Sequence, residues 1–270
     1  MLSGHAQVTG WLNWRGPQQT GESAETSLPS DFNAASALWT APIHSRGTPV
    51  IAHTPQGDRL YLWGYTGERE KLREGLWCLD ADTGKVLWQH LESDFLSDVV
   101  YDRYAIGAPV VDPRTGNIYW LTSAGLFSAF NPEGKLLWQH SMMEEYGRLT
   151  FPNGRSGAPV IEGDLVIVQG ITSNWGSDGP ARNRFYAFDT LTGDLVWSST
   201  PGTQPKDSTF STPILADWNG QRVLYAGTGC GHVVAINART GKPLWRYLVS
   251  MGGVNASVIL HRAGTYAEPV

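Results

Sequence analysis

Cysteine and charge are both scarce in this sequence of 270 residues. The two cysteines, Cys78 and Cys230, are too few for a disulfide framework and form neither an adjacent pair nor a CxxC motif. Charged residues make up only 17% of the chain, which excludes the highly charged, disordered class. Lys and Arg number 20 against 25 Asp and Glu, so the chain lacks the basic face that binding to nucleic acid requires.

Long hydrophobic runs and catalytic signatures are missing as well. No stretch approaches the roughly 18 apolar residues of a membrane span, and no basic region followed by an apolar one marks an export signal. The sequence has no GxSxG, HExxH, P-loop or EF-hand motif. Its seven histidines have no metal-ligand spacing. We therefore predict no membrane span, no metal site and no catalytic residue.

Glycine, proline and tryptophan are abundant in contrast. The 31 glycines and 16 prolines are too many for a helical bundle and favour a turn-rich β protein. Tryptophan, normally the scarcest aromatic residue, occurs 12 times, against 10 tyrosines and 8 phenylalanines. This surplus indicates a structural position that recurs along the chain.

An internal repeat supplies that position. The unit A-x-D-x-x-T-G-x-x-x-W occupies residues 187–197, and variants of it occupy residues 78–88, 129–138 and 235–245. Each unit ends on a tryptophan, and an incomplete copy surrounds Trp39. These five tryptophans lie 49, 50, 59 and 48 residues apart, about the length of one propeller blade. A second landmark recurs in phase, namely a small residue, a proline and a β-rich run, at residues 48–51, 108–111, 158–161 and 212–215.

The repeat has a physical reason. An Asp or Asn that opens the turn can accept from backbone N–H groups two residues on, and the glycine supplies the positive φ that the turn needs. The tryptophan is expected to fill the wedge between neighbouring sheets, with its indole N–H bonded to a carbonyl. The residues assigned this structural role are Asp80, Gly84, Trp88, Gly134, Trp138, Asp189, Gly193, Trp197, Asn237, Gly241 and Trp245.

The repeat predicts an all-β fold, a β-propeller of four-stranded antiparallel blades. We place an N-terminal segment at residues 1–37 and the repeats at 38–270, with blades at about 46–90, 105–140, 155–199 and 209–247 and a partial blade from 253. Two architectures remain open: an incomplete ring from a chain that stops mid-blade, and a small ring closed by the strand around Trp39. An incomplete ring leaves unpaired edges, so self-association is expected unless a partner covers them.

The repeat unit resembles the tryptophan-docking motif of the pyrroloquinoline quinone (PQQ)-like β-propeller repeat family. The opening NWRGP, Asn13–Pro17, resembles the N-terminus of exported bacterial members, and the resemblance covers roughly residues 11 to 260. It implies a periplasmic or extracellular location. The family holds quinoprotein alcohol and glucose dehydrogenases alongside non-catalytic propellers such as the outer-membrane assembly lipoprotein, so the motif implies no single activity.

The resemblance also implies what a dehydrogenase of this family would need. Such enzymes hold Ca²⁺ with a Glu and an Asn, use an Asp base, stack PQQ on a Trp and often carry an adjacent Cys–Cys disulfide. This chain has no such cysteine pair, offers no Asp that matches the base, and is much shorter. We therefore expect a non-catalytic binding or scaffold module without a cofactor. A fragment of a PQQ- and Ca²⁺-dependent quinoprotein dehydrogenase is the alternative.

The loops that interrupt the repeat carry the candidate binding residues, because a rigid scaffold displays function on its loops. Residues 91–106, 141–156 and 201–209 connect consecutive blades, and 171–184 joins two strands of one blade, so all four are expected on one face. Arginines, carboxylates and an aromatic residue suit a protein partner or a small polar ligand. The alternative is that these charges are solvated and pair with each other. The candidates are Asp102, Arg103, Tyr104, Glu144, Glu145, Arg148, Asn153, Arg155, Asn174, Trp175 and Asp207.

Overall fold

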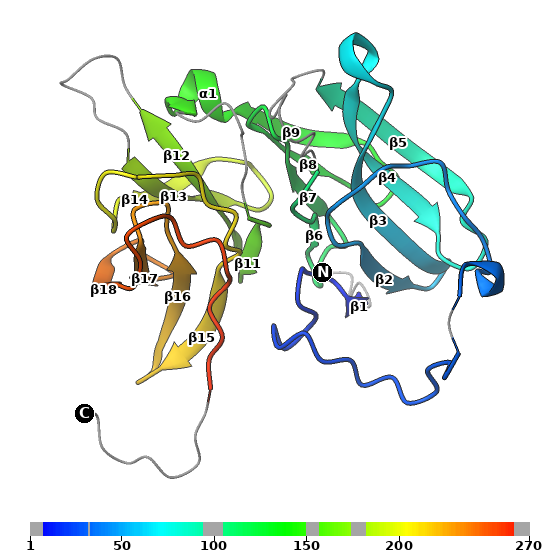
Figure 1. The fold of residues 1–270 in the computed structure, drawn as a ribbon, viewed down its shortest axis with the longest axis horizontal. Coiled ribbons are helices and arrows are strands. Elements are labelled where there is room, and N and C mark those ends of the chain that lie inside the picture. Colours follow the sequence, from blue (N-terminus) through cyan, green and yellow to red (C-terminus); the bar gives the residue numbers. More distant parts are fainter. Residues whose placement is uncertain (1–7, 32, 94–104, 150–156, 174–181, 262–270) are drawn as a thin grey trace, which may run out of the picture.

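The computed structural model describes residues 8–31, 33–93, 105–149, 157–173 and 182–261. These residues form four antiparallel sheets, here called blades 1 to 4 in chain order, whose first strands lie towards one common centre, here called the channel (Figure 1). The predicted all-β, propeller-like class is confirmed. The described blades form an open arc, with blades 1 and 4 at its two ends.

The strands follow the repeat from the channel outwards. Blade 1 contains β1 (Thr9–Trp11), β2 (Val50–Thr54), β3 (Gly57–Thr66), β4 (Arg73–Asp80) and β5 (Val86–Ser93). Blade 2 contains β6 (Val110–Val111), β7 (Ile118–Leu121), β8 (Leu126–Phe130) and β9 (Leu136–Ser141). Blade 3 contains β10 (Arg148–Leu149), β11 (Val160–Glu162), β12 (Leu165–Ser173), β13 (Arg182–Asp189) and β14 (Leu195–Ser199). Blade 4 contains β15 (Ile214–Trp218), β16 (Gln221–Gly227), β17 (His232–Asn237) and β18 (Pro243–Leu248).

The described residues also form three short helical turns. The 3₁₀ turns cover Ala34–Ser36 and Arg69–Lys71, and the helix α1 covers Met142–Glu145. No helix among the described residues is long and apolar enough to cross a membrane.

Two blades have a strand more than predicted. In blade 1, β1 pairs with the inner edge of β2, so the N-terminal segment reaches the channel. In blade 3, β10 pairs with the far end of β12, on the edge that β11 also uses. The prediction of a small ring closed by the strand around Trp39 is wrong for the described chain. Trp39 forms no strand with blade 4 and instead donates its indole N–H to Ala81 O of blade 1, at 2.9 Å.

The small residue that opens each repeat unit lies opposite the tryptophan that ends it. Cys78 pairs with Trp88 across β4 and β5, and Ala187 pairs with Trp197 across β13 and β14. The register shifts directly after the small residue in all four blades. Such a bulge bends the strand and re-aims its side chains. The recurring small residue therefore leaves room for the indole and helps to turn it towards the next blade.

Each of the first three blade tryptophans packs on the Thr-Gly or Glu-Gly turn of the following blade. A Cβ added to Gly134 would lie 2.7 Å from the Trp88 ring, and one added to Gly193 would lie 2.8 Å from the Trp138 ring. These glycines have φ values of 81° and 78°, which side-chain-bearing residues adopt only with strain. The turn thus needs glycine twice, for its conformation and for the close approach of the indole. Trp39 and Trp197 lie in the same way against Gly84 and Gly241.

A hydrogen bond accompanies most of these ring contacts. Trp88 Nε1 donates to Pro132 O at 2.9 Å, and Trp138 Nε1 donates to Thr190 O at 3.2 Å. Trp197 differs, because its Nε1 is buried with no hydrogen-bond partner in the described structure. The predicted indole–carbonyl bond therefore forms at Trp39, Trp88 and Trp138 but not at Trp197.

Histidines two residues after Trp88 and Trp138 strengthen the same contact. His90 Nε2 donates to Gly134 O at 2.5 Å, and the His90 ring stacks on Phe130. His140 Nε2 donates to Gly193 O at 2.7 Å, and its ring stacks on Phe188. Each histidine therefore binds the glycine of the turn that its neighbouring tryptophan covers. These two residues are part of the interface between blades.

Hydrophobic clusters fill the space between consecutive blades. One cluster joins Trp63 and Leu76 of blade 1 to Trp120 of blade 2, and the next joins Phe127 of blade 2 to Phe188 of blade 3. A third joins blades 3 and 4 and includes Trp197. The fourth cluster is small and lies on blade 4 with Val258 against it. Burial between sheets is therefore the main stabilising term, and the outer side of blade 4 carries only the small fourth cluster.

We predict that Gly193→Ala destabilises the fold more than Gly220→Ala does. Both glycines have φ near 75°, so each substitution costs about 1–2 kcal/mol of backbone strain. Only Gly193 faces a ring, because nothing lies within 4 Å of a Cβ at Gly220. The clash with Trp138 should add about 1–3 kcal/mol. Denaturant unfolding measures both values, and equal losses in the two variants would contradict this account of the turn.

Candidate functional site

The N-terminal segment crosses the channel and bonds to the inner strands of three blades. It contacts blade 1 by strand pairing, where Trp11 lies opposite Ile51. It contacts blade 2 through Leu12 O, which accepts from Val111 N at 2.9 Å. It contacts blade 4 through the Gln19 side chain, whose amide donates to Leu215 O and accepts from Leu215 N. The NWRGP stretch therefore lies at the axis of the arc.

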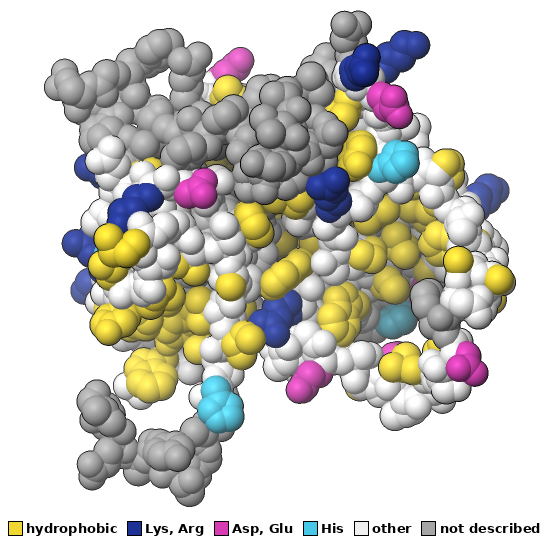
Figure 2. Space-filling view, viewed as in Figure 1, with side chains coloured by type: hydrophobic (Ala, Val, Ile, Leu, Met, Phe, Trp, Pro, Cys, Tyr) yellow, Lys and Arg dark blue, Asp and Glu magenta, His cyan; other side chains and the backbone are white. Residues whose placement is uncertain are grey.

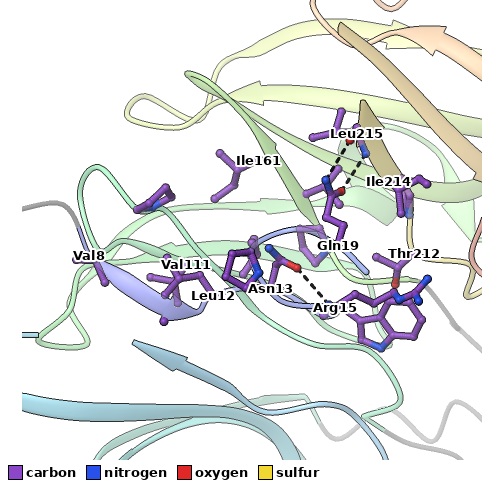
Figure 3. A pocket seen from close by; sticks show the side chains of 18 of the residues that line it. Val8, Leu12, Asn13, Arg15, Gln19, Val111, Ile161, Thr212, Ile214 and Leu215 are labelled. Carbon is purple, nitrogen blue, oxygen red and sulfur yellow. Dashed lines mark hydrogen bonds between the residues drawn. The ribbon is translucent and has the colours of Figure 1, made fainter. Parts of the chain in front are cut away.

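A cavity of about 710 Å³ lies between this segment and the inner strands of blades 2, 3 and 4 (Figure 3). Its volume is in the range of small-molecule sites. Apolar side chains such as Val111, Ile161 and Ile214 form much of its lining, and Asn13, Arg15 and Thr212 add polar groups. We call this space the channel cavity.

A second feature is an exposed apolar surface on the last strand of blade 4. We define the Trp245 surface as Leu244, Trp245, Tyr247, Leu248 and Val249, all exposed. In Figure 2 hydrophobic side chains gather on this side of the molecule, over the strands of blade 4. Trp245 is 47% exposed and Tyr247 is 70% exposed, whereas the equivalent Trp197 is 8% exposed. The tryptophan position is therefore exposed in blade 4, whereas it is buried or half-buried in the other blades.

Four of the residues predicted for the loop-rich face lie in the described part of the chain. Glu144 and Glu145 belong to α1, and Arg148 begins β10, so these three follow one another along one segment. Glu145 accepts from His140 Nδ1 and from Ser141 N, so it caps its own segment. Asp207 lies in another loop and accepts from Ser208 N. Among the described residues no hydrogen bond or ion pair joins Asp207 to α1.

The other predicted residues of that face lie outside the described residues. They are Asp102, Arg103, Tyr104, Asn153, Arg155, Asn174 and Trp175. Their grouping around one mouth stays a prediction. The sequence reasoning also missed Arg15 and Gln19, which line the channel cavity, although both lie in or beside the NWRGP motif that was singled out.

A buried carboxyl group, Glu74, joins blades 1 and 2. Its oxygens accept from the Ser123 backbone and hydroxyl at 3.0 and 2.5 Å, and from Ala105 N at 3.3 Å. Burial raises the pKa of Glu74 above its ordinary value, although these hydrogen bonds oppose the rise. The group sits between two blades, and its hydrogen bonds to described residues link blade 1 to Ala105 and Ser123.

The two cysteines have opposite environments. Burial raises the pKa of the Cys78 thiol to about 12. Burial acts in the same direction on Cys230, but hydrogen bonds from Thr228 and from the Thr203 backbone outweigh it and hold the pKa of the thiol below its ordinary value. Cys230 Sγ lies 3.0 Å from Thr228 Oγ1 and 3.3 Å from His232 Nδ1. Both cysteines are free thiols, in blades 1 and 4.

The described residues do not fit the cofactor of a quinoprotein dehydrogenase. No three His, Cys, Asp or Glu side chains of the described ranges come close enough together to hold a metal ion. Calcium is bound by six to eight oxygen atoms from carboxylates, carbonyls and water, and the buried carboxyl of Glu74 is already held by Ser123 and Ala105.

Comparison with protein families identifies the repeat. The family model described as outer membrane protein assembly factor BamB matches residues 24–156 and again residues 78–266. The chain belongs to this PQQ-like repeat family. The resemblance read from the A-x-D-x-x-T-G-x-x-x-W unit is thereby confirmed.

Individual relatives include enzymes. The chain is 35% identical over 92 residues to the dehydrogenase subunit of a quinone alcohol dehydrogenase from Gluconobacter oxydans, a match that covers 31% of this chain and 11% of that protein. Quinohemoprotein alcohol dehydrogenase from Comamonas testosteroni shares the fold, with a TM-score of 0.59 and 17% identity over 88% of this chain and 41% of the other. A europium-containing methanol dehydrogenase also shares the fold, with a TM-score of 0.56 and 18% identity. That match covers 88% of this chain and 48% of the other. The chain thus spans less than half the length of these relatives.

We predict that the two thiols ionise in widely separated pH ranges. In a Cys78→Ser variant, the remaining thiolate should appear below the ordinary pKa of a cysteine, because the hydrogen bond from the Thr228 hydroxyl stabilises the anion of Cys230. In a Cys230→Ser variant the thiolate should appear only near the upper end of the accessible range, at about 12. Ultraviolet thiolate absorbance follows each titration in the folded protein. Coincident titrations would contradict the two environments.

Proposed function

We propose that this PQQ-like propeller is a non-catalytic binding module that engages a protein partner through the Trp245 surface. The single observation behind the proposal is that Trp245 and Tyr247 stand exposed at positions whose counterparts contact a neighbouring blade. Trp88 with His90 and Trp138 with His140 are those counterparts. The loop-rich face, including Glu144 and Asp207, remains a second proposed surface for a protein or a small polar ligand.

The Trp245 ring is already oriented for such a contact. Its centroid lies 5.9 Å from that of Tyr225, with the planes tilted by 46°. The Tyr61–Trp88 pair has 5.8 Å and 45°, and the Tyr119–Trp138 pair has 5.8 Å and 37°. A residue held in its bound orientation loses little conformational entropy on binding. Exposed tryptophan and tyrosine are also the residues that contribute most at protein interfaces.

The contacts inside the chain define the chemistry of the partner. It must present a tight turn with glycine at positive φ, so that the indole can lie on the backbone without meeting a Cβ. It must also offer two carbonyl oxygens. One lies just before that glycine and accepts from the indole N–H. The other belongs to the glycine itself and accepts from the Tyr247 hydroxyl, which takes the place of histidine Nε2. A β-sheet blade of this same repeat class meets these requirements. We therefore propose that the Trp245 surface binds such a blade of the partner.

A hairpin taken from the chain itself tests the assignment. Residues 185–199 contain the Thr190–Gly193 turn on which Trp138 packs, and a disulfide between added terminal cysteines would keep the isolated hairpin folded. Calorimetry should detect binding of this hairpin to the wild-type protein. Binding should fall at least tenfold in Trp245→Ala, and for a hairpin with Gly193→Val. Trp218→Ala removes another exposed tryptophan of blade 4 and should bind normally.

Two outcomes of that experiment would overturn the proposal. One is that the folded hairpin does not bind the wild-type protein at millimolar concentration. The other is that Trp245→Ala and Trp218→Ala lower the affinity equally, because a general hydrophobic contact would then explain the binding.

We predict a sharp contrast in stability between equivalent tryptophans. Trp138→Ala should cost about 3–5 kcal/mol, because it removes a ring packed between two blades together with its bond to Thr190 O. Trp245→Ala should cost about 1 kcal/mol or less, since half of that ring is exposed. Thermal or denaturant unfolding of the two variants checks this. Similar losses would show that Trp245 already serves the fold and is not held for a partner.

The similarity to a quinone alcohol dehydrogenase over 92 residues favours one other function, that of a quinoprotein dehydrogenase fragment. We predict that PQQ with Ca²⁺ leaves the unfolding transition unchanged, since the described residues supply no donor set for the metal. A ligand that binds only the native state would add about 2.7 kcal/mol at a hundred times its Kd. A shift of that size, together with dye-linked alcohol oxidation, would replace the proposed function by the enzymatic one.

Membership of the family also supports a location. We place the module in the periplasm or outside the cell, where the outer membrane assembly factor that gives the family model its description is expected to act.

A further inference from the structure

One equivalent residue position recurs at the channel on the inner strand of each of the four blades. It is the fourth residue of the small-Pro-β landmark, namely Ile51, Val111, Ile161 and Leu215. In an antiparallel pair alternate residues direct their N–H and C=O away from the neighbouring strand. Glu162 and Leu165 flank the two-residue turn between β11 and β12, so Ile161, one position earlier, directs its backbone groups towards the channel.

The N-terminal segment binds three of these four positions. Ile51 is paired by β1, Val111 N donates to Leu12 O, and Leu215 exchanges two hydrogen bonds with the Gln19 amide. Within the described residues no such bond reaches Ile161, and Ile161 lines the channel cavity. Blade 3 therefore presents an open strand edge inside a cavity whose other edges are filled.

A cationic side chain lies in the lining of the same cavity. Arg15 donates to Thr20 O at 2.6 Å, and its guanidinium lies 5.8 Å from the centre of the Trp14 ring. No described carboxylate pairs with it, whereas the two other arginines of the lining, Arg114 and Arg222, pair with Asp112 and Glu162. Arg15 is thus the one cation of the described lining whose charge no acidic side chain balances.

We infer that the channel cavity binds a short extended peptide that carries a carboxylate. The peptide backbone pairs with the N–H and C=O of Ile161, as the Gln19 amide does with Leu215. The carboxylate faces Arg15, which forms charge-assisted hydrogen bonds with such groups. The apolar walls of Val111, Ile161 and Ile214 receive aliphatic side chains. Addition of a strand to a free edge is a common way to bind peptides, and the backbone bonds then give affinity while pockets give specificity.

The site is separate from the Trp245 surface in position and in chemistry. The channel cavity lies among inner strands, and the Trp245 surface belongs to the outermost strand of blade 4. Each can therefore fail its own test without affecting the other.

Calorimetry with N-acetyl-Val-Ile-Ala tests the inference. The peptide acid should bind the wild-type protein, and its C-terminal amide should bind at least tenfold more weakly because it lacks the charge that Arg15 recognises. A peptide methylated at the central backbone nitrogen should also bind at least tenfold more weakly, because it cannot donate to Ile161 O. Both comparisons use the unaltered protein, so they do not depend on how a variant folds.

Variants and hydrogen exchange locate the binding. Arg15→Gln should lower the affinity for the peptide acid at least tenfold. Arg246→Gln alters an arginine of β18 away from the cavity and should leave that affinity unchanged. The peptide should also slow exchange at the Ile161 amide. No binding at millimolar peptide would overturn the inference. Equal affinity for acid and amide, or a loss in Arg246→Gln equal to that in Arg15→Gln, would overturn it too.

Discussion

The contact of an indole ring with a glycine turn is the interaction on which the rest of this structure depends. Each blade is an antiparallel sheet with two faces to bury. Its tryptophan packs against the next blade and so helps to bury one of those faces. The ring can lie on the backbone only because the turn has no Cβ at Gly134 or Gly193. The indole N–H and the following histidine then bond to carbonyls of that turn. Packing, turn conformation and hydrogen bonding thus agree at one point in the repeats that end on Trp88 and Trp138, whereas Trp197 keeps only the ring contact.

The regularity of the repeat explains both surfaces to which function is assigned. A unit that binds its successor leaves an unused copy of the contact on the last described blade, so Trp245 and Tyr247 are exposed. At the channel the constraint is different, because inner strands cannot be covered by neighbouring blades. The N-terminal segment fills that role for three blades and leaves Ile161 open. Both surfaces are therefore positions where the repeat is regular but its partner is missing among the described residues.

Much of the fold could be predicted from the sequence, because the information is local and repeated. The spacing of Trp88, Trp138, Trp197 and Trp245, with a glycine four residues before each, specifies hairpins, bulges and blade order. The site could not be predicted in the same way. The path of residues 8–19 across the channel depends on pairing between distant positions, such as Gln19 with Leu215, and no short-range pattern encodes it. The lowered pKa of Cys230 likewise comes from Thr203 and Thr228, which meet only in the folded chain.

A double-mutant cycle between Trp138 and Gly193 tests the central claim most directly. Trp138→Phe, Gly193→Ala and the double variant would be unfolded in denaturant, and the coupling free energy taken from the three losses. If the ring and the turn hold blades 2 and 3 together as one contact, the coupling should be about 1 kcal/mol or more. Losses that simply add would contradict the account, because the tryptophan and the glycine would then stabilise their blades separately.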